Sequence, residues 1–90
     1  MTKINAVVID DEHLNRDLII KLITKLNQNF EVIGEAEDIN SGYDLITEKQ
    51  PDVVFLDIKM PGGNGFQLLN RIKNIEFEVV FITGFDEYAI

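Results

Sequence analysis

The chain has 90 residues, enough for one small domain, and 46% of them are hydrophobic, which is typical of a globular protein and argues against a disordered chain. Its formal net charge of −8 argues against direct binding of nucleic acid or an anionic membrane, and no apolar run approaches the roughly 20 residues of a membrane-spanning helix. The absence of cysteine excludes disulfides, thiolate metal sites and cysteine nucleophiles, and the first residues do not form a signal peptide. Together these features predict a soluble, cytoplasmic protein.

The first half of the chain alternates between predicted strands and helices. Ile4–Ile9 is a short apolar run typical of a buried strand. The next segment predicts a helix, because leucines recur in it at steps of four, namely Leu14, Leu18, Leu22 and Leu26. Phe30–Ala36 is a second strand, whose more polar composition predicts a place at the edge of a sheet. Asp38 can then cap a helix that continues through Lys49.

The second half repeats this alternation. A strand is predicted over Asp52–Asp57, and a turn-rich loop over Met60–Gly65 follows it. Asn64 can cap a third helix, and Glu78–Thr83 is the fourth predicted strand. Strands that alternate with helices predict an α/β fold with a parallel sheet and right-handed crossovers.

Oxygen-bearing side chains stand at the ends of three apolar strands. Asp10 and Asp11 follow the first strand, Asp57 ends the third and Thr83 ends the fourth. The carboxyl ends of parallel strands lie at one edge of the sheet, where ligands bind in open α/β folds, so these side chains should meet there. Acidic residues are also common at strand ends simply because loops are polar. Two adjacent acids, a third acid and a hydroxyl at three strand ends nevertheless favour a cation or phosphoryl site.

Three carboxylates held in one pocket repel one another unless a cation lies among them. A cluster of oxygen ligands favours Mg²⁺, Mn²⁺ or Ca²⁺, and an incomplete cage suits Mg²⁺, which keeps waters and a phosphate oxygen. Such a metal makes transfer of a phosphoryl group onto a carboxylate feasible. Asp57 is the expected acceptor, because it stands alone at a strand end beside a glycine-rich loop. Asp10 and Asp11 are the expected metal ligands. Thr83 can donate a hydrogen bond to the phosphoryl group.

These residues resemble the receiver domain of two-component response regulators. The matching motifs, in chain order, are Val8–Glu12, Gly34–Ala36, Pro51–Pro61, Gly65 and Phe81–Thr83. They are spread over the whole chain in the order and spacing of the family. The stretch from Thr83 to Ala89 further resembles receivers that are attached to LytTR-type DNA-binding domains.

The resemblance implies a flavodoxin-like, doubly wound sheet with strand order 2-1-3-4-5. It implies that a sensor histidine kinase phosphorylates Asp57 in a Mg²⁺-dependent reaction and so switches a downstream output. Asp11 would bind the metal directly, Asp10 mainly through water, and Lys59 through its backbone carbonyl. Asp57 would itself be a further metal ligand. Thr83 would shift toward the phosphoryl group after transfer, and this differential contact would drive the switch.

Two parts of the family pattern are missing from the sequence, namely a fifth strand that carries an invariant lysine and the fifth helix after it. We therefore expect residues 1–90 to be a receiver domain that is incomplete at its C-terminal end, with strand order 2-1-3-4. The fourth strand, Glu78–Thr83, would then be a bare sheet edge, which predicts a dimer or another pairing through that edge. The DNA-binding output domain is expected outside this chain, and direct contact of this segment with nucleic acid or membrane is not expected.

Two other functions stay open at this point. A Mg²⁺-dependent phosphatase or phosphotransferase with an aspartyl nucleophile usually has a second Asp two residues after the first, whereas this chain has Lys59 there. A receiver-like interaction module that no longer takes phosphate would fit the missing lysine but not the intact acidic residues. The preferred hypothesis is a phosphoacceptor domain that is not a turnover enzyme. His13 is expected to be an ordinary surface residue.

Overall fold

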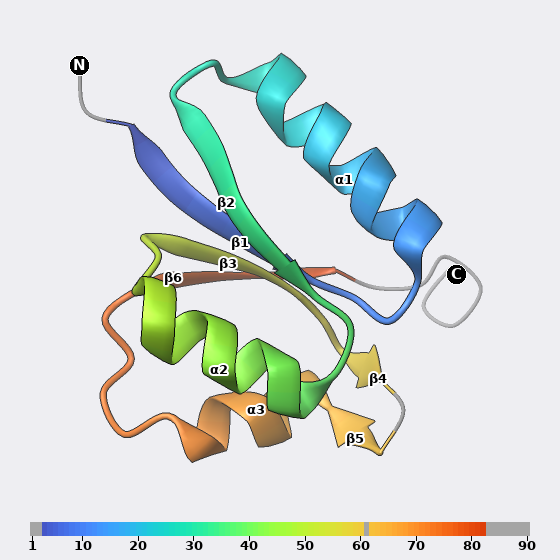
Figure 1. Cartoon of the computed structure of the whole chain (residues 1–90), viewed down its shortest axis with the longest axis vertical. Helices are drawn as coiled ribbons and strands as arrows, with labels where there is room; N and C mark the ends of the chain where they lie inside the picture. The colour runs from blue at the N-terminus through green and yellow to red at the C-terminus, as the bar shows by residue number, and fades with distance from the viewer. Residues whose placement is uncertain (1–2, 61, 83–90) are drawn as a thin grey trace.

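The computed structural model describes residues 3–60 and 62–82, which form a four-stranded parallel sheet with flanking helices (Figure 1). The parallel strands are β1 (Ile4–Ile9), β2 (Phe30–Ala36), β3 (Val53–Asp57) and β6 (Glu78–Ile82). The helices are α1 (His13–Leu26), α2 (Ile39–Lys49) and α3 (Gly65–Arg71). The order β2-β1-β3-β6 confirms the predicted flavodoxin-like arrangement, with the polar second strand at one edge.

Both predicted helix caps are confirmed. The Asp38 carboxylate accepts a hydrogen bond from the backbone N–H of Ser41, and the Asn64 side chain accepts one from the backbone N–H of Gln67. In each case the third helical residue also accepts a hydrogen bond from the backbone N–H of the cap, which completes a capping box. Local sequence therefore fixes where α2 and α3 begin.

The hydrophobic core lies between the sheet and the helices α2 and α3. Val7 and Ile9 of β1, Val54 and Leu56 of β3 and Leu68 of α3 meet there and are all 0% exposed. Alternate residues of a strand face the same side of the sheet, which explains why these positions of β1 and β3 share one face. Burying an aliphatic side chain of this size contributes about 1.5–3 kcal/mol to stability. This packing holds rigidly the strand ends that carry the acidic residues.

The predicted first helix is confirmed as α1, and its leucines do not face the sheet. The leucine stripe is exposed, with values of 79%, 57%, 49% and 84% for Leu14, Leu18, Leu22 and Leu26. Ile23 is the residue of α1 that is buried. A helix has 3.6 residues per turn, so each leucine four residues further on is displaced slightly around the helix axis. A run of leucines at this step therefore does not keep to one side of the helix. A continuous apolar stripe in the sequence was therefore not the packing face.

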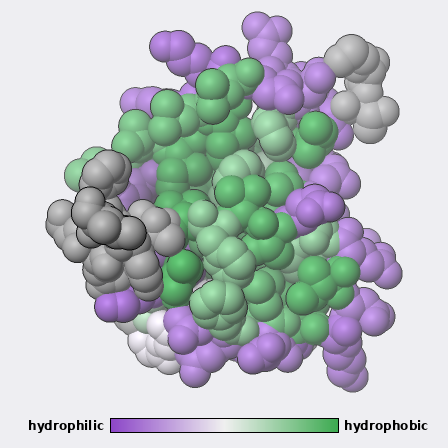
Figure 2. All heavy atoms as spheres, turned by 180° about the vertical axis from the view of Figure 1, so that it is seen from behind, coloured by the Kyte–Doolittle hydropathy of each residue, from purple (hydrophilic) through white to green (hydrophobic). Residues whose placement is uncertain are grey.

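Strand β6 forms the other edge of the described sheet, and it also leaves apolar side chains exposed. Val80 and Phe81 are 43% and 39% exposed, and the Phe81 ring packs against that of Phe66 at a tilt of 39°, with the ring centroids 4.9 Å apart. Figure 2, which views the molecule from behind, shows hydrophobic side chains gathered in a broad surface with a hydrophilic border. Apolar side chains gathered on one exposed face are typical of a surface against which another protein segment packs.

The segment predicted as a turn-rich loop contains a small antiparallel pair. It consists of β4 (Lys59–Met60) and β5 (Gly63–Asn64), in which Lys59 pairs with Asn64. Gly62 has a φ of 81°, a left-handed conformation that glycine adopts without strain and that closes the turn. The pair holds the backbone after Asp57 against the start of α3.

No helix among residues 3–60 and 62–82 has the length and apolar character needed to cross a membrane.

Candidate functional site

The structure brings three of the predicted acidic residues together at the carboxyl edge of the sheet. Carboxylate oxygens of Asp10, Asp11 and Asp57 all lie within 4.8 Å of one another. The parallel pairing of β1 with β3 explains this, since Ile9 is opposite Leu56 and the acids come directly after these two residues. We call these three carboxylates the acidic pocket.

Asp10 is held in place by its backbone and its side chain alike. It is 1% exposed, and its backbone N–H donates to the carbonyl of Ala36 at 3.0 Å. Its carboxylate accepts a hydrogen bond of 2.9 Å from the backbone N–H of Glu12, and its carbonyl accepts one of 2.7 Å from the guanidinium of Arg16. These contacts tie Asp10, which directly follows β1, to the end of β2 and to the start of α1.

Asp57 is less tightly held. Its carboxylate accepts a hydrogen bond of 3.3 Å from the backbone N–H of Lys59. The next residue, Ile58, is held by two backbone hydrogen bonds. Its N–H donates to the carbonyl of Ile82, and the carbonyl of Ile58 accepts from the N–H of Gly65. The backbone around Asp57 is therefore rigid, while its carboxylate is half-buried at the mouth of the pocket.

Burial and mutual repulsion make the acidic pocket unfavourable for negative charge. Burial, and then the negative charge of Asp10, raises the pKa of Asp57 from 3.8 to about 6, although the hydrogen bond from Lys59 works against this. Burial also raises the pKa of Asp10, and the charges of Asp11 and Glu12 add to the rise. A cation among the three carboxylates would relieve both effects.

Gly65 makes the close packing beside Asp57 feasible. A Cβ atom at this position would lie 2.7 Å from the backbone carbonyl oxygen of Asp57 and 3.0 Å from Cγ of Leu56. Both distances are shorter than ordinary van der Waals contact, so only glycine fits without displacing the chain. The glycine that the sequence placed in the loop thus allows the start of α3 to press against the end of β3.

The donor set fits a hard divalent cation. Every side-chain ligand in the acidic pocket is a carboxylate oxygen, which is the type that Mg²⁺ prefers, and three carboxylates leave coordination positions for water and phosphate. A shallow depression of about 400 Å³ adjoins the pocket and is lined by Asp11, Lys59, Met60, Gly63 and Asn64. A phosphoryl group could enter from that side.

The remaining predicted site residues differ in what the structure shows of them. Lys59 is the first residue of the short strand β4, and its backbone N–H donates to the carboxylate of Asp57. Thr83 lies outside the described residues. Arg16 was not anticipated, although its guanidinium contacts the backbone of Asp10. A single arginine in an amphipathic helix gives no signal of such a role, because the contact depends on how α1 crosses the sheet.

Comparison with known proteins identifies the class. Residues 6–90 match the family described as the response regulator receiver domain. The chain therefore belongs to the response regulator receiver domain family, whose members serve in two-component signalling.

Individual relatives narrow this assignment. The chain is 37% identical to the sensory transduction protein LytT of Bacillus subtilis over 97% of its own length, and 37% identical to LytR of Streptococcus mutans over 96%. These matches confirm the resemblance to LytTR-type regulators. The chain spans 36% of the length of each of these two relatives.

Solved receiver structures share the fold. The signal receiver domain of NarL from Mycobacterium tuberculosis superposes with a TM-score of 0.83 at 34% identity, covering 99% of this chain and 73% of that one. The response regulator domain of CheB from Thermotoga maritima gives a TM-score of 0.80 at 30% identity, over 97% of this chain and 65% of that one. The βαβ order and the sheet order predicted from the sequence are thus those of receiver domains.

Proposed function

We propose that this domain accepts a phosphoryl group on Asp57 from a sensor histidine kinase, with Mg²⁺ bound in the acidic pocket. The observation that carries the proposal is the convergence of Asp10, Asp11 and Asp57 within 4.8 Å at the carboxyl edge of the sheet. Family membership supports it, because the class is a signalling domain and not a metabolic enzyme.

Each residue has a distinct part in this proposal. An oxygen of Asp57 forms a bond to phosphorus while the bond between phosphorus and the donor breaks, which leaves an acyl phosphate on the protein. Asp11 binds the metal directly, Asp10 binds it mainly through water, and the backbone carbonyl of Lys59 supplies a further oxygen. When bound, Mg²⁺ neutralises the phosphoryl oxygens and the surrounding carboxylates. Thr83 contacts the transferred phosphoryl group and passes the change to the output.

The raised pKa of Asp57 bears on this chemistry. A carboxyl group that titrates at about 6 is still partly protonated just below neutral pH, and a protonated carboxyl is not a nucleophile. Mg²⁺ in the pocket favours the charged form, so metal binding and activation of Asp57 are coupled. Phosphorylation should therefore lose rate steeply as pH falls below 6 when Mg²⁺ is scarce.

A phosphatase of the aspartyl-nucleophile type is the second candidate, and the loop after β3 argues against it. The residue two positions after Asp57 is the exposed Lys59, whereas such phosphatases usually have an aspartic acid there as the general acid for the leaving alcohol. A module that only binds other proteins is the third candidate. The burial of Asp10 argues against the interaction module, because a buried carboxylate destabilises the fold unless it binds a cation.

We further propose that residues 1–90 are part of a larger receiver domain, in which a fifth strand with a lysine and a fifth helix complete the sheet. Two observations support a larger domain. The leucines of α1 and Val80 are exposed, as expected if further elements cover them, and the chain covers only part of the NarL receiver. Without that cover, β6 is expected to pair with a second copy of the chain. A LytTR-type DNA-binding domain would follow in the whole protein, which we place in the cytoplasm, while this acidic segment itself contacts neither DNA nor membrane.

The decisive experiment offers the chain acetyl phosphate and Mg²⁺ and follows the protein by intact mass spectrometry. A single phosphate adduct is expected, and Asp57→Asn should abolish it. Asp44→Asn is the matched control, because it removes an exposed carboxylate on α2, a helix that contributes no carboxylate to the acidic pocket.

The outcomes separate the three candidates. No adduct, on this chain or on one extended past Ile90, would favour the interaction module. An adduct only on the extended chain would show that the added strand and its lysine are required. Repeated turnover of a phosphomonoester would favour the phosphatase. Size-exclusion chromatography with light scattering on both chains tests pairing through β6, which predicts a dimer for the shorter chain and a monomer for the longer one.

A further inference from the structure

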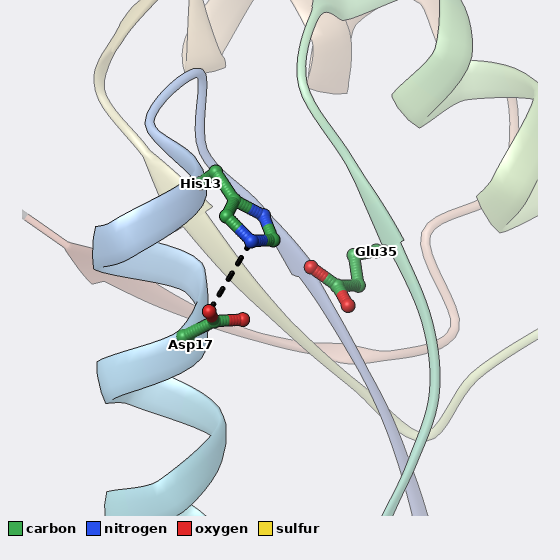
Figure 3. Close-up of side chains that lie close together, drawn as sticks. All are labelled: His13, Asp17 and Glu35. Atoms are coloured by element: carbon green, nitrogen blue, oxygen red, sulfur yellow. Dashed lines mark ion pairs between the residues drawn. The ribbon is translucent and has the colours of Figure 1, made fainter.

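A second group of metal-ligating side chains lies near the acidic pocket. His13 and Asp17 stand one turn apart on α1, and Glu35 reaches toward them from β2 (Figure 3). The Nε2 atom of His13 lies 3.3 Å from Oδ2 of Asp17, and one ligand atom from each of the three residues lies within 4.8 Å of the others. Figure 3 shows both carboxylates turned toward the imidazole.

We propose that His13, Asp17 and Glu35 form a binding site for a divalent transition metal ion such as Zn²⁺. In tetrahedral zinc sites the metal lies about 2.0–2.2 Å from nitrogen and oxygen ligands, which places neighbouring ligand atoms roughly 3.3–3.6 Å apart. The pair formed by His13 and Asp17 already has this separation. Glu35 reaches it by a movement of about 1.5 Å or less, which a half-exposed side chain can make by rotation. Water would complete the coordination.

The two sites differ in the metals that their ligands select. The acidic pocket offers oxygen alone, which favours Mg²⁺, whereas an imidazole nitrogen favours zinc, nickel or copper over magnesium. His13 is the only histidine in the sequence, and there is no cysteine, so this cluster is where the chain can offer a softer ligand. The site is independent of the proposed phosphorylation and would exist whether or not Asp57 takes phosphate.

Arg16 has two effects on the proposed metal site: its charge disfavours a cation, and its contacts orient the ligands. Its Nε donates to Oε1 of Glu35 at 2.9 Å, and a terminal nitrogen lies 3.4 Å from Nδ1 of His13. The positive charge lowers the affinity for a cation, but the contact orients the Glu35 carboxylate toward the helix. Acidic neighbours offset the charge, because the adjoining depression of about 470 Å³ is also lined by Glu37 and Asp38. The depression leaves space for a metal ion with its waters.

The test titrates the chain with Zn²⁺ in excess Mg²⁺, which occupies the acidic pocket, and measures binding by calorimetry. Titration with Co²⁺ adds a spectroscopic reading, because a tetrahedral site gives strong visible absorption. We expect one equivalent to bind and the imidazole resonances of His13 to shift. His13→Ala and Glu35→Gln should each weaken binding at least about tenfold.

Two control variants give the test its specificity. Glu31→Gln makes the same change at another exposed glutamate of β2 and should leave the affinity unchanged. Asp57→Asn removes a ligand of the acidic pocket and should also leave it unchanged. The proposal is overturned if no metal binds, if Asp57→Asn abolishes binding, or if Glu35→Gln has no effect while His13→Ala does, since that last result would indicate a single surface imidazole.

Discussion

Ile9 and Asp10 are consecutive residues, 0% and 1% exposed, yet their burial has opposite consequences. Ile9 belongs to the core under α2 and α3, where removal of hydrocarbon from water stabilises the fold. Asp10 belongs to the acidic pocket, where loss of water destabilises the charged carboxylate and raises its pKa. In the same way, Leu56 of β3 belongs to the core and the next residue, Asp57, belongs to the acidic pocket. On both strands the acidic pocket therefore begins one residue after the core ends.

This proximity gives the core a second role. Three carboxylates that repel one another would move apart if they stood on flexible segments. Here the parallel pairing of β1, β3 and β6 fixes the backbone at each strand end, and the core fixes the strands. The core therefore supplies the free energy that holds an unfavourable arrangement together until a cation binds it.

The largest effect is expected from the core. Leu68→Ala should lower the free energy of unfolding by about 2–5 kcal/mol, because the side chain is fully buried and its removal leaves a cavity. Leu18→Ala is the matched control on α1, and its 57% exposure predicts a loss below about 0.5 kcal/mol. Urea denaturation monitored by circular dichroism measures both. Equal losses would mean that the leucine stripe of α1 is covered in solution, as it would be in a dimer.

A change at the junction of the two regions should affect both stability and function. Gly65→Ala places a methyl group 2.7 Å from the carbonyl oxygen of Asp57, which we expect to lower stability by about 1–3 kcal/mol and to slow phosphorylation of Asp57. Gly62→Ala is the contrasting variant, because its Cβ would meet nothing within 4 Å and its strain is confined to a φ of 81°. It should lose stability but retain the rate of adduct formation. Equal rates in the two variants would refute the role given to Gly65.

The acidic pocket should make stability fall as pH rises, in contrast to the core. The pKa of Asp57 is about 6 in the folded state and 3.8 without the shift, so the folded state binds more protons between these values. The destabilising effect of the Asp57 charge is therefore absent below pH 3.8 and complete above about pH 6. We expect a loss of about 1–2 kcal/mol across this range without metal, a value reduced for solvent screening of a half-buried group.

Asp57→Asn and Mg²⁺ provide the two ways to remove this effect. The amide cannot ionise, so the variant should be more stable than the wild type above pH 6 and equal to it near pH 4. Saturating Mg²⁺ should flatten the pH profile of the wild type and leave that of the variant nearly unchanged. Thermal unfolding at a series of pH values measures both. A wild-type profile that rises between pH 4 and 7 without metal would contradict the assignment.

Local sequence signals predicted much of the fold. The bounds of Ile4–Ile9 and Phe30–Ala36 agree with the structure, as do the caps at Asp38 and Asn64. These features depend on nearest neighbours along the chain and on strong local preferences, which a sequence displays directly. The position of the acidic pocket followed from one further step, since carboxyl ends of parallel strands share an edge.

Contacts between distant segments were not predictable in the same way. The repeated leucines of α1 predicted a helix, but the side of the helix that is buried depends on how it crosses the sheet, and Ile23 is the residue buried there. The contact of Arg16 with Asp10 and Glu35, and the approach of Glu35 to His13, arise from that same crossing. Both the unforeseen arginine and the proposed second metal site therefore come from one tertiary feature.

The smallest effect is expected at Asp38, an aspartate whose surroundings are opposite to those of Asp57. It accepts hydrogen bonds from the backbone N–H and the hydroxyl of Ser41, which lower its pKa, so it stabilises the fold above pH 3.8 and loses that effect as pH falls further. Asp38→Ala should lower the melting temperature slightly, and Asp38→Asn, which still caps the helix, should lower it less. The difference between the alanine variant and the wild type should shrink below pH 3.8. If this difference in melting temperature persisted unchanged below pH 3.8, the Asp38 cap would stabilise the helix by hydrogen bonding without its charge. The charge of Asp38 would then not contribute to stability, in contrast to that of Asp57.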